Sequence, residues 1–333
     1  ILTFANNVSS RPLAALLALF LGVATIILLT IMIQIEKRGH YMSVSKVKTT
    51  IVKQKIRNPI LNVLAHVYAY LLFLIYVIPV ALVVLFSFTD SATIASKHLT
   101  LSSFTLDNYI SIFQKASSYK PFVVSIAYSA IAASFVAIIV LIACRILQKR
   151  KDRLGGALEY GLLIPWLLPT TLMALGLITT YNTPRVWMFN KVLTGTSVIM
   201  LIGYIIIKIP FTLRMTKAAF FSLDDSLEDA ARNMGAKPFY TFMRVQLPII
   251  LPTVLAIFAL NFNGLLGDYD MSVFMYHPLN KPLGVYIKSL TDSETNADNA
   301  ALTFVYAVLM MIISAVVMYL VYGRGNKVDK SKD

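Results

Sequence analysis

Side chains that could perform chemistry are sparse in this sequence. The four histidines, His40, His66, His98 and His277, are scattered and do not have the spacing of a metal-ligand cluster. Cys144 is the one cysteine, so no disulfide can form within the chain. The sequence also lacks a G-x-x-x-x-G-K-[ST] loop for binding nucleotide phosphates. We therefore predict no catalytic residue, no metal site and no cofactor bound by this chain.

Acidic side chains gather in residues 267–301, which carry five carboxylates against two lysines. Asp268 and Asp270 flank Tyr269 and offer hard oxygen donors, which suit highly charged cations. The alternative is that these acids form a solvated mouth that meets a basic surface of another protein.

A second polar segment, residues 222–248, has the pattern of a docking helix. Asp225 and Glu228 have the spacing of a capping box, and an acidic first turn that includes Asp229 suits the helix dipole. Gly235 can end such a helix with a positive φ angle. One apolar stripe has the spacing of a single helix face: Leu227, Ala230, Ala231 and Met234. The alanines would let another protein approach closely, whereas an amphipathic helix on a lipid surface is the alternative.

Hydrophobic segments must position these residues, because 57% of the 333 residues are hydrophobic and only 14% are charged. Soluble domains carry roughly 25% charged residues, so a bilayer is the expected solvent. A spanning helix needs about 20 mostly apolar residues. Seven segments qualify: Pro12–Gln34, Val63–Phe88, Phe122–Leu147, Gly161–Tyr181, Gly195–Ile207, Leu247–Leu266 and Leu302–Tyr322. The fifth is short, and we expect it to continue through Lys208 to Leu213. We predict an all-α polytopic membrane protein.

The net charge of +14 follows the pattern that orients membrane proteins. Of the 30 lysines and arginines, 22 lie in residues 35–62, 145–160, 208–246 and the tail after 322. The segments between them hold the other eight. This alternation predicts an outside N-terminus and a cytoplasmic C-terminus, and it explains the basic charge without a nucleic-acid partner.

Ionisable side chains are nearly absent from the apolar segments, with Lys208 close to a predicted inner boundary. Ion-coupled carriers place such groups within the membrane, because coupling needs a group that changes charge there. An ion-coupled secondary carrier is therefore the disfavoured alternative. Four polar residues are candidates for a solute path: Thr180, Asn261, Asp268 and Asp270. Asn261 either bonds a neighbouring helix or faces a channel.

The loop between the fifth and sixth segments resembles the EAA signature of binding-protein-dependent ABC importers. That signature is Glu-Ala-Ala, three residues, Gly, nine residues and Ile-x-Leu-Pro. The matching residues here are Asp229, Ala230, Ala231, Gly235, Val245, Leu247 and Pro248, with Asp in place of Glu and Val in place of Ile. The resemblance covers about residues 63–322.

The resemblance implies a type I ABC importer permease fold, with a six-helix core plus one N-terminal helix. It implies a permease that is not itself an enzyme, in the inner membrane of a prokaryote, with ATP and Mg²⁺ bound by a partner ATPase dimer. An extracytoplasmic solute-binding protein and the lipid bilayer complete the expected partners. The residues implied to couple to the ATPase are Asp225, Leu227, Glu228, Asp229, Ala230, Ala231, Met234, Gly235, Val245, Leu247 and Pro248.

Two permease units are needed, and some members of this family fuse both in one polypeptide. We therefore expect residues 1–34 to hold the final helix of a preceding unit and residues 35–62 to form a basic cytoplasmic linker. Residues 63–322 would form the six-helix permease domain with coupling loop 222–248, and 323–333 a cytoplasmic tail. The alternative is one seven-helix unit with an accessory helix.

The pattern from Asp268 to Pro278, followed by Pro282–Val285, resembles ferric-iron permeases and related polyamine-type permeases. Ferric iron is the leading expectation on this resemblance alone. A polyamine, thiamine or phosphonate remains the alternative solute.

Overall fold

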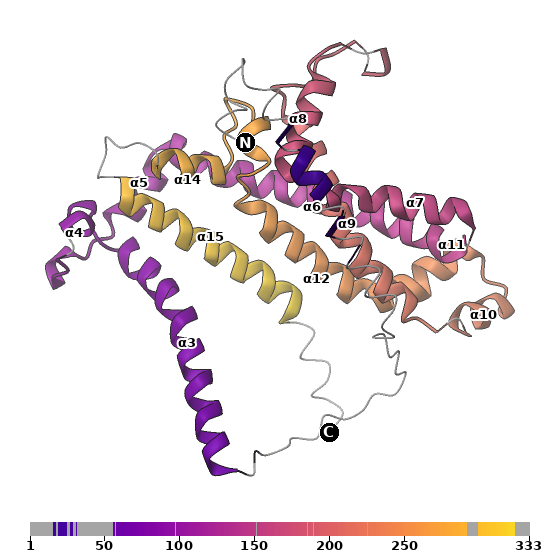
Figure 1. The fold of residues 1–333 in the computed structure, drawn as a ribbon, viewed down its shortest axis with the longest axis horizontal. Helices are drawn as coiled ribbons and strands as arrows, with labels where there is room; N and C mark the ends of the chain where they lie inside the picture. The colour runs from indigo at the N-terminus through magenta and orange to yellow at the C-terminus, as the bar shows by residue number, and fades with distance from the viewer. Residues whose placement is uncertain are drawn as a thin grey trace.

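The structure is a computed structural model that describes most of the chain. The described residues are 58–96, 98–150, 152–184, 186–188, 190–224, 226–291 and 299–323, with Ile56 and scattered positions between 16 and 31. Within these ranges the chain is helical, and its only β-structure is two isolated bridges (Figure 1). The main helices are α3 (Pro59–Ser87), α4 (Ser91–Ser96), α5 (Asp107–Gln114), α6 (Ala116–Lys149), α7 (Arg153–Leu163), α8 (Thr170–Tyr181), α9 (Ser197–Phe221), α10 (Ser226–Asn233), α11 (Pro238–Thr241), α12 (Leu247–Leu266), α13 (Ser272–Met275), α14 (Leu283–Thr291) and α15 (Asn299–Tyr322). Shorter turns are η2 (Leu101–Ser103), η3 (Ile164–Leu167), η4 (Val186–Met188) and the π-helix η5 (Phe242–Gln246).

Five helical stretches in the described part are long and apolar enough to cross a membrane. They are Pro59–Ser87, Ala116–Lys149, Ser197–Phe221, Pro238–Leu266 and Asn299–Tyr322. Each contains or overlaps one of the predicted segments. The predicted segment Pro12–Gln34 falls mostly outside the described residues.

The predicted boundaries need two corrections. The helix α3 begins at Pro59, within the predicted linker 35–62, because Asn58 Oδ1 accepts a hydrogen bond from Ile60 N at 2.9 Å and caps the helix. The segment predicted as Gly195–Ile207, with a continuation to Leu213, runs as α9 to Phe221. Lys208 therefore lies near the middle of a spanning helix and not at its inner end.

The predicted span Gly161–Tyr181 is broken rather than straight. The helical stretches Arg153–Leu167 and Thr170–Tyr181 meet at an angle of 107°. Leu168, at the break, has φ −105° and ψ 135°, the extended conformation that a following proline imposes. Pro169 thus ends one helix and begins the next. The two helical stretches form a sixth span only if they are counted together as one bent span.

The core lies where α6, α9 and α12 pack against one another (Figure 1). Small residues on α6, such as Ala132, Ala133 and Cys144, are fully buried and let the neighbouring helices approach closely. Leu213 and Phe220 of α9 are buried in the same cluster as Cys144. This close packing fixes the end of α6 relative to the beginning of α12, which matters for the site below.

The helix α3 stands apart from this core. It packs along α15, where the rings of Phe86 and Phe304 lie 5.5 Å apart, and its other end diverges from the bundle (Figure 1). In its most apolar stretch no residue is buried. Such an exposed apolar surface is unfavourable in water and supports the bilayer as the solvent of this protein.

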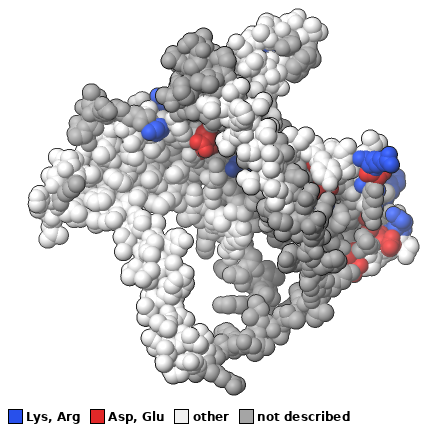
Figure 2. All heavy atoms as spheres, in the orientation of Figure 1, with Lys and Arg blue, Asp and Glu red and all other residues white. Residues whose placement is uncertain are grey.

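Charged side chains gather at the end of the molecule that carries α10 and α11. Figure 2 shows lysines, arginines and acids there, while most of the visible face has no charge. The coupling loop thus lies at the polar end of an apolar bundle.

Candidate functional site

The coupling loop, residues 222–248, folds as three short helical elements before α12. The helix α10 begins after Asp224, whose Oδ1 accepts a hydrogen bond from Ser226 N at 3.0 Å. Asp225, predicted as the capping residue, lies outside the described residues. The acidic residues Glu228 and Asp229 occupy the first turn, where they complement the helix dipole.

Gly235 ends α10 as predicted, with a φ angle of 81°. Gly235 N donates to Arg232 O at 2.9 Å and Ala236 N donates to Ala231 O at 3.0 Å. These two bonds form a Schellman motif, in which the residue with positive φ reverses the chain. The chain therefore turns back towards the bundle at Gly235, four residues after Ala231.

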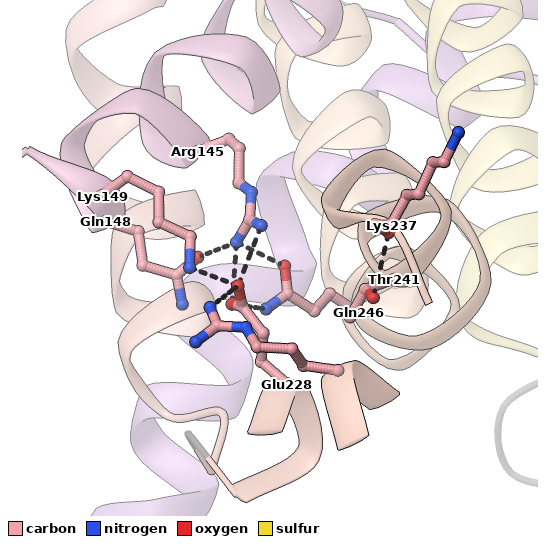
Figure 3. A network of polar contacts seen from close by, with 8 residues as sticks. Arg145, Gln148, Lys149, Glu228, Lys237, Thr241 and Gln246 are labelled. Carbon is pink, nitrogen blue, oxygen red and sulfur yellow. Dashed lines mark hydrogen bonds and ion pairs between the residues drawn. The ribbon is translucent and has the colours of Figure 1, made fainter. Parts of the chain in front are cut away.

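Glu228 is the centre of a polar network that ties α10 to two other elements (Figure 3). Arg145 of α6 donates to both carboxylate oxygens, at 3.2 and 3.3 Å, and Lys149 of the same helix forms an ion pair with Glu228. Gln246 Nε2, at the end of η5, donates to Glu228 Oε2 at 3.1 Å. Arg145 also donates to Gln246 Oε1 at 3.0 Å, which closes the network. We call these residues the Glu228 clamp.

The clamp keeps its carboxylate ionised. Burial alone would raise the pKa of Glu228, but hydrogen bonds and charge from Arg145 and Lys149 outweigh it and lower the pKa from 4.5 to about 2. The Glu228 and Arg145 side chains are only 12% and 17% exposed, so solvent screens this pair weakly. Lys149 is 45% exposed, so its pair with Glu228 is screened more. Charge-assisted hydrogen bonds of this kind are worth about 1.5–3 kcal/mol each, more than neutral ones.

Part of the outer surface of α10 is apolar and exposed, and the side chain of Arg232 is 66% exposed there as well. Ala231 is 3% exposed and packs inward, whereas Met234 is 81% exposed and Leu227 is 37% exposed. Ala230 and Asp229 are also exposed. The residues of the predicted apolar stripe therefore differ in position. Ala231 packs against the protein, whereas Leu227, Ala230 and Met234 face outward.

The rest of the signature forms the connection from α10 to the membrane. Val245 and Leu247 are half-buried, and Leu247 packs against the core, while Pro248 lies at the exposed beginning of α12. The π-helix η5 widens this stretch by one residue per turn, a feature frequent at functional sites. Within it, the ring of Phe242 stacks on that of Phe220 at 6.2 Å.

The four predicted path residues lie in three different environments. Asn261 is 2% exposed and donates to Thr212 Oγ1 of α9 at 2.7 Å, so it bonds a neighbouring helix. Thr180 is exposed near the end of α8. Asp268 and Asp270 do meet, at the lining of a cavity of about 580 Å³ between the end of α12 and α15.

Sequence reasoning missed three residues of the clamp: Arg145, Lys149 and Gln246. It counted the two cations only as charges that orient the chain. Their spacing of four residues places both on one face of α6, and this was the available signal for a shared acidic partner. Which carboxylate they meet depends on tertiary packing, since Glu228 is 83 residues from Arg145.

The fold and this site define a class: a multi-pass helical membrane protein with a braced, partly exposed helix at its polar end. The chain belongs to the family of binding-protein-dependent transport system inner membrane components, whose model matches residues 56–325.

Relatives of known sequence agree with this family. The probable ABC transporter permease protein y4fN of Sinorhizobium fredii is 36% identical over 315 residues, which are 94% of this chain and 55% of that protein. The putative 2-aminoethylphosphonate transport system permease protein PhnV of Salmonella paratyphi A is 24% identical over 212 residues, or 64% of this chain and 78% of that protein. This chain therefore spans about half the length of y4fN.

A solved structure shows the same fold. The chain resembles a subunit of a bacterial ABC transporter involved in the import of the acidic polysaccharide alginate, with a TM-score of 0.64 and 15% identity. The match covers 80% of this chain and 96% of that one. The predicted all-α permease fold of type I ABC importers is thereby confirmed.

Proposed function

We propose that this chain is the transmembrane permease subunit of an ATP-driven importer. It receives a solute from an extracytoplasmic binding protein and passes it to the cytoplasm, while a partner ATPase dimer binds and hydrolyses ATP with Mg²⁺. The observation that carries the proposal is α10, whose exposed apolar surface is braced to two spanning helices by the Glu228 clamp.

In this scheme the coupling loop works as a lever. The thin surface formed by Leu227, Ala230 and Met234 enters a groove of the ATPase, and closure of the ATPase dimer displaces α10. Glu228 carries that displacement to α6 through Arg145 and Lys149, and to α12 through Gln246. Because the bonds are charge-assisted and largely shielded from water, the three elements move together.

The test replaces an exposed residue of α10 that no fold contact requires. With Met234→Arg, we expect the ATP hydrolysis stimulated by loaded binding protein to fall about ten-fold, since a desolvated charge in the groove costs at least 1.4 kcal/mol or so. Leu101→Arg is the matched control, because Leu101 is 94% exposed and lies outside both the coupling loop and the acidic segment 267–301. Equal activity of the two variants in reconstituted transporter would refute the docking role of α10.

The same scheme proposes where the protein lies. We place it in the inner membrane of a prokaryote, with α10 and the C-terminus on the cytoplasmic side, supported by the distribution of lysine and arginine. A second permease unit supplies the second coupling loop, either upstream in the same polypeptide or as a separate chain. The exposed apolar surface of α3 suits lipid or that second unit.

Two solutes have specific support. Ferric iron is favoured by the hard oxygen donors of Asp268 and Asp270, which meet at one cavity. An aminoalkyl phosphonate is favoured by the relative PhnV, whose name gives 2-aminoethylphosphonate transport. Uptake of labelled ferric iron and labelled 2-aminoethylphosphonate by cells with and without this transporter separates them, because only the true solute loses its ATP-dependent uptake.

One observation favours the second class of transporter, the ion-coupled carrier. Lys208 lies near the middle of α9, where a group that changes charge would be needed. The binding-protein-dependent family argues against it. Uptake that survives loss of the ATPase but stops with a protonophore would establish the carrier.

A further inference from the structure

The α12–α15 cavity is a pocket of about 580 Å³ that the coupling mechanism does not use. Its lining comes from the last turn of α12, the following residues 267–270 and the facing side of α15. Pockets that hold small organic molecules have volumes of roughly 300–1,000 Å³, so the space suits such a solute.

One part of the lining is rich in hydrogen-bond acceptors. The carboxylates of Asp268 and Asp270 are joined there by Asn263, whose Oδ1 is buried and has no hydrogen-bond partner among the described residues. A buried acceptor without a partner is costly. Because this oxygen has almost no exposed surface, a donor brought by a ligand reaches it only if the Asn263 side chain turns towards the cavity. Asp268 is held in place because Ser272 N donates to its Oδ2 at 3.0 Å.

The opposite part of the lining is apolar. Met310 and Met311 of α15 contribute thioether side chains, which pack well against a carbon chain but offer little to a hydrated metal ion. Such an apolar wall suits an organic cation better than a metal ion.

A positive charge sits at the edge of the same cavity. The Nζ of Lys208 would lie 2.9 Å from a Cβ added at Gly264, so the ammonium of α9 rests against the backbone of this lining residue. A multivalent metal cation would be repelled by this ammonium, whereas an anionic group on the solute would be attracted. A side chain at position 264 would displace the flexible end of Lys208.

We propose that the α12–α15 cavity is a binding site for a small zwitterionic amine during its passage through the permease. The ammonium of the solute lies against Asp268, Asp270 and Asn263, its carbon chain lies along Met310 and Met311, and its anionic group faces Lys208. This inference rests on the importer function proposed above. Of the two solutes considered there, it favours the amine-bearing anion over ferric iron.

The experiment measures the charge preference of the cavity directly with a thiol probe. Ser314 lines the cavity, and Ser314→Cys would place a reactive thiol there. The one native cysteine, Cys144, is fully buried, so background reaction is low. In right-side-out vesicles that contain the whole transporter, we would compare 2-(trimethylammonium)ethyl and 2-sulfonatoethyl methanethiosulfonate, with each rate divided by that of a free thiol.

The cationic reagent should react roughly ten-fold faster than the anionic one after this correction, because two carboxylates attract it. Adding Asp268→Asn and Asp270→Asn should remove the preference. Asp107→Asn, an exposed acid of α5 outside the cavity lining, should preserve it. An excess of 2-aminoethylphosphonate should slow the labelling, and an excess of sulfate should not.

The inference is overturned by a rate ratio that does not depend on the two carboxylates, or by sulfate that protects as well as the amine. A thiol that neither reagent reaches overturns it too, because the cavity would then be covered in the assembly. Met311→Cys repeats the measurement if Ser314→Cys fails to assemble. Labelling needs no ATP, so charge-selective labelling without ATP-dependent uptake would refute the importer and leave the site standing.

Discussion

At the scale of single residues, the clamp concentrates several interactions on one carboxylate. Glu228 accepts hydrogen bonds from Arg145 and Gln246 and pairs with Lys149, while Asp229 beside it is exposed. Removing the charge of Glu228 would leave the Arg145 guanidinium, which is 17% exposed, without its counter-charge. The residue that holds α10 in place is therefore Glu228. It is the neighbour of Asp229, which occupies the acidic position of the signature.

We expect Glu228→Gln to destabilise the purified permease by about 2 kcal/mol, because a neutral amide replaces charge-assisted hydrogen bonds. Thermal unfolding of the purified protein measures this. Asp229→Asn is the matched control and should change stability by less than about 0.5 kcal/mol, as exposed substitutions usually do. Equal losses from the two variants would contradict the clamp.

The pH dependence gives a second check on the same residue. The pKa of Glu228 is about 2 in the folded protein against an ordinary 4.5, so its ionised form stabilises the fold above pH 4.5. That contribution is lost as the pH falls from 4.5 towards 2. The stability difference between wild type and Glu228→Gln should therefore shrink over this window, and a difference that stays constant would argue against the ion pairs.

At the scale of elements, local patterns predicted what depends on local structure. The helix that carries Leu227, Ala230 and Ala231 follows from spacing, and it is found as α10 (Ser226–Asn233). Its end at Gly235 follows from the freedom of glycine, and Gly235 has a φ of 81°. The partners of Glu228 and Asn261 were not predictable in this way, because they are supplied by residues far away in sequence.

The broken span shows the same limit. A proline at position 169 predicts a kink, since the residue before it is driven to an extended conformation. The observed angle of 107° depends on how α8 packs against α9 and α13, which no local pattern contains. The end of α9 was likewise placed too early, because the predicted continuation through Lys208 stopped at Leu213 and the helix runs to Phe221.

Gly235 offers a test that belongs to the element it ends. An added Cβ would meet no atom within 4 Å, so the cost of substitution comes from its φ of 81° and not from lack of space. We expect Gly235→Ala to cost about 1–2 kcal/mol locally and to lower coupled ATP hydrolysis, because an alanine disfavours this conformation. Gly235→Asn should retain most of the activity, since asparagine tolerates positive φ. Equal loss in both variants would show that size and not backbone conformation matters there.

At the scale of the whole molecule, the two sites lie at opposite ends of α12. The clamp joins its beginning through Gln246, and the α12–α15 cavity is formed at its last turn. A displacement of α10 would thus reach the cavity along one helix, which contains Pro252 and is also packed against α6 and α9. This arrangement accounts for how an event at the polar end could open or close a solute site at the other.

The arrangement requires the two ends to face opposite sides of the membrane. Met234 and Leu279 are 81% and 74% exposed, and the one native cysteine is buried, so cysteine substitution at each reports its side without competing reaction. In intact cells, an impermeant maleimide should label Leu279→Cys at once and Met234→Cys only after the cells are permeabilised. The distribution of basic residues predicts this order, because lysines and arginines favour the cytoplasmic side. Labelling of Met234→Cys from outside would place the lever beyond the reach of any cytoplasmic ATPase and would refute the proposed coupling.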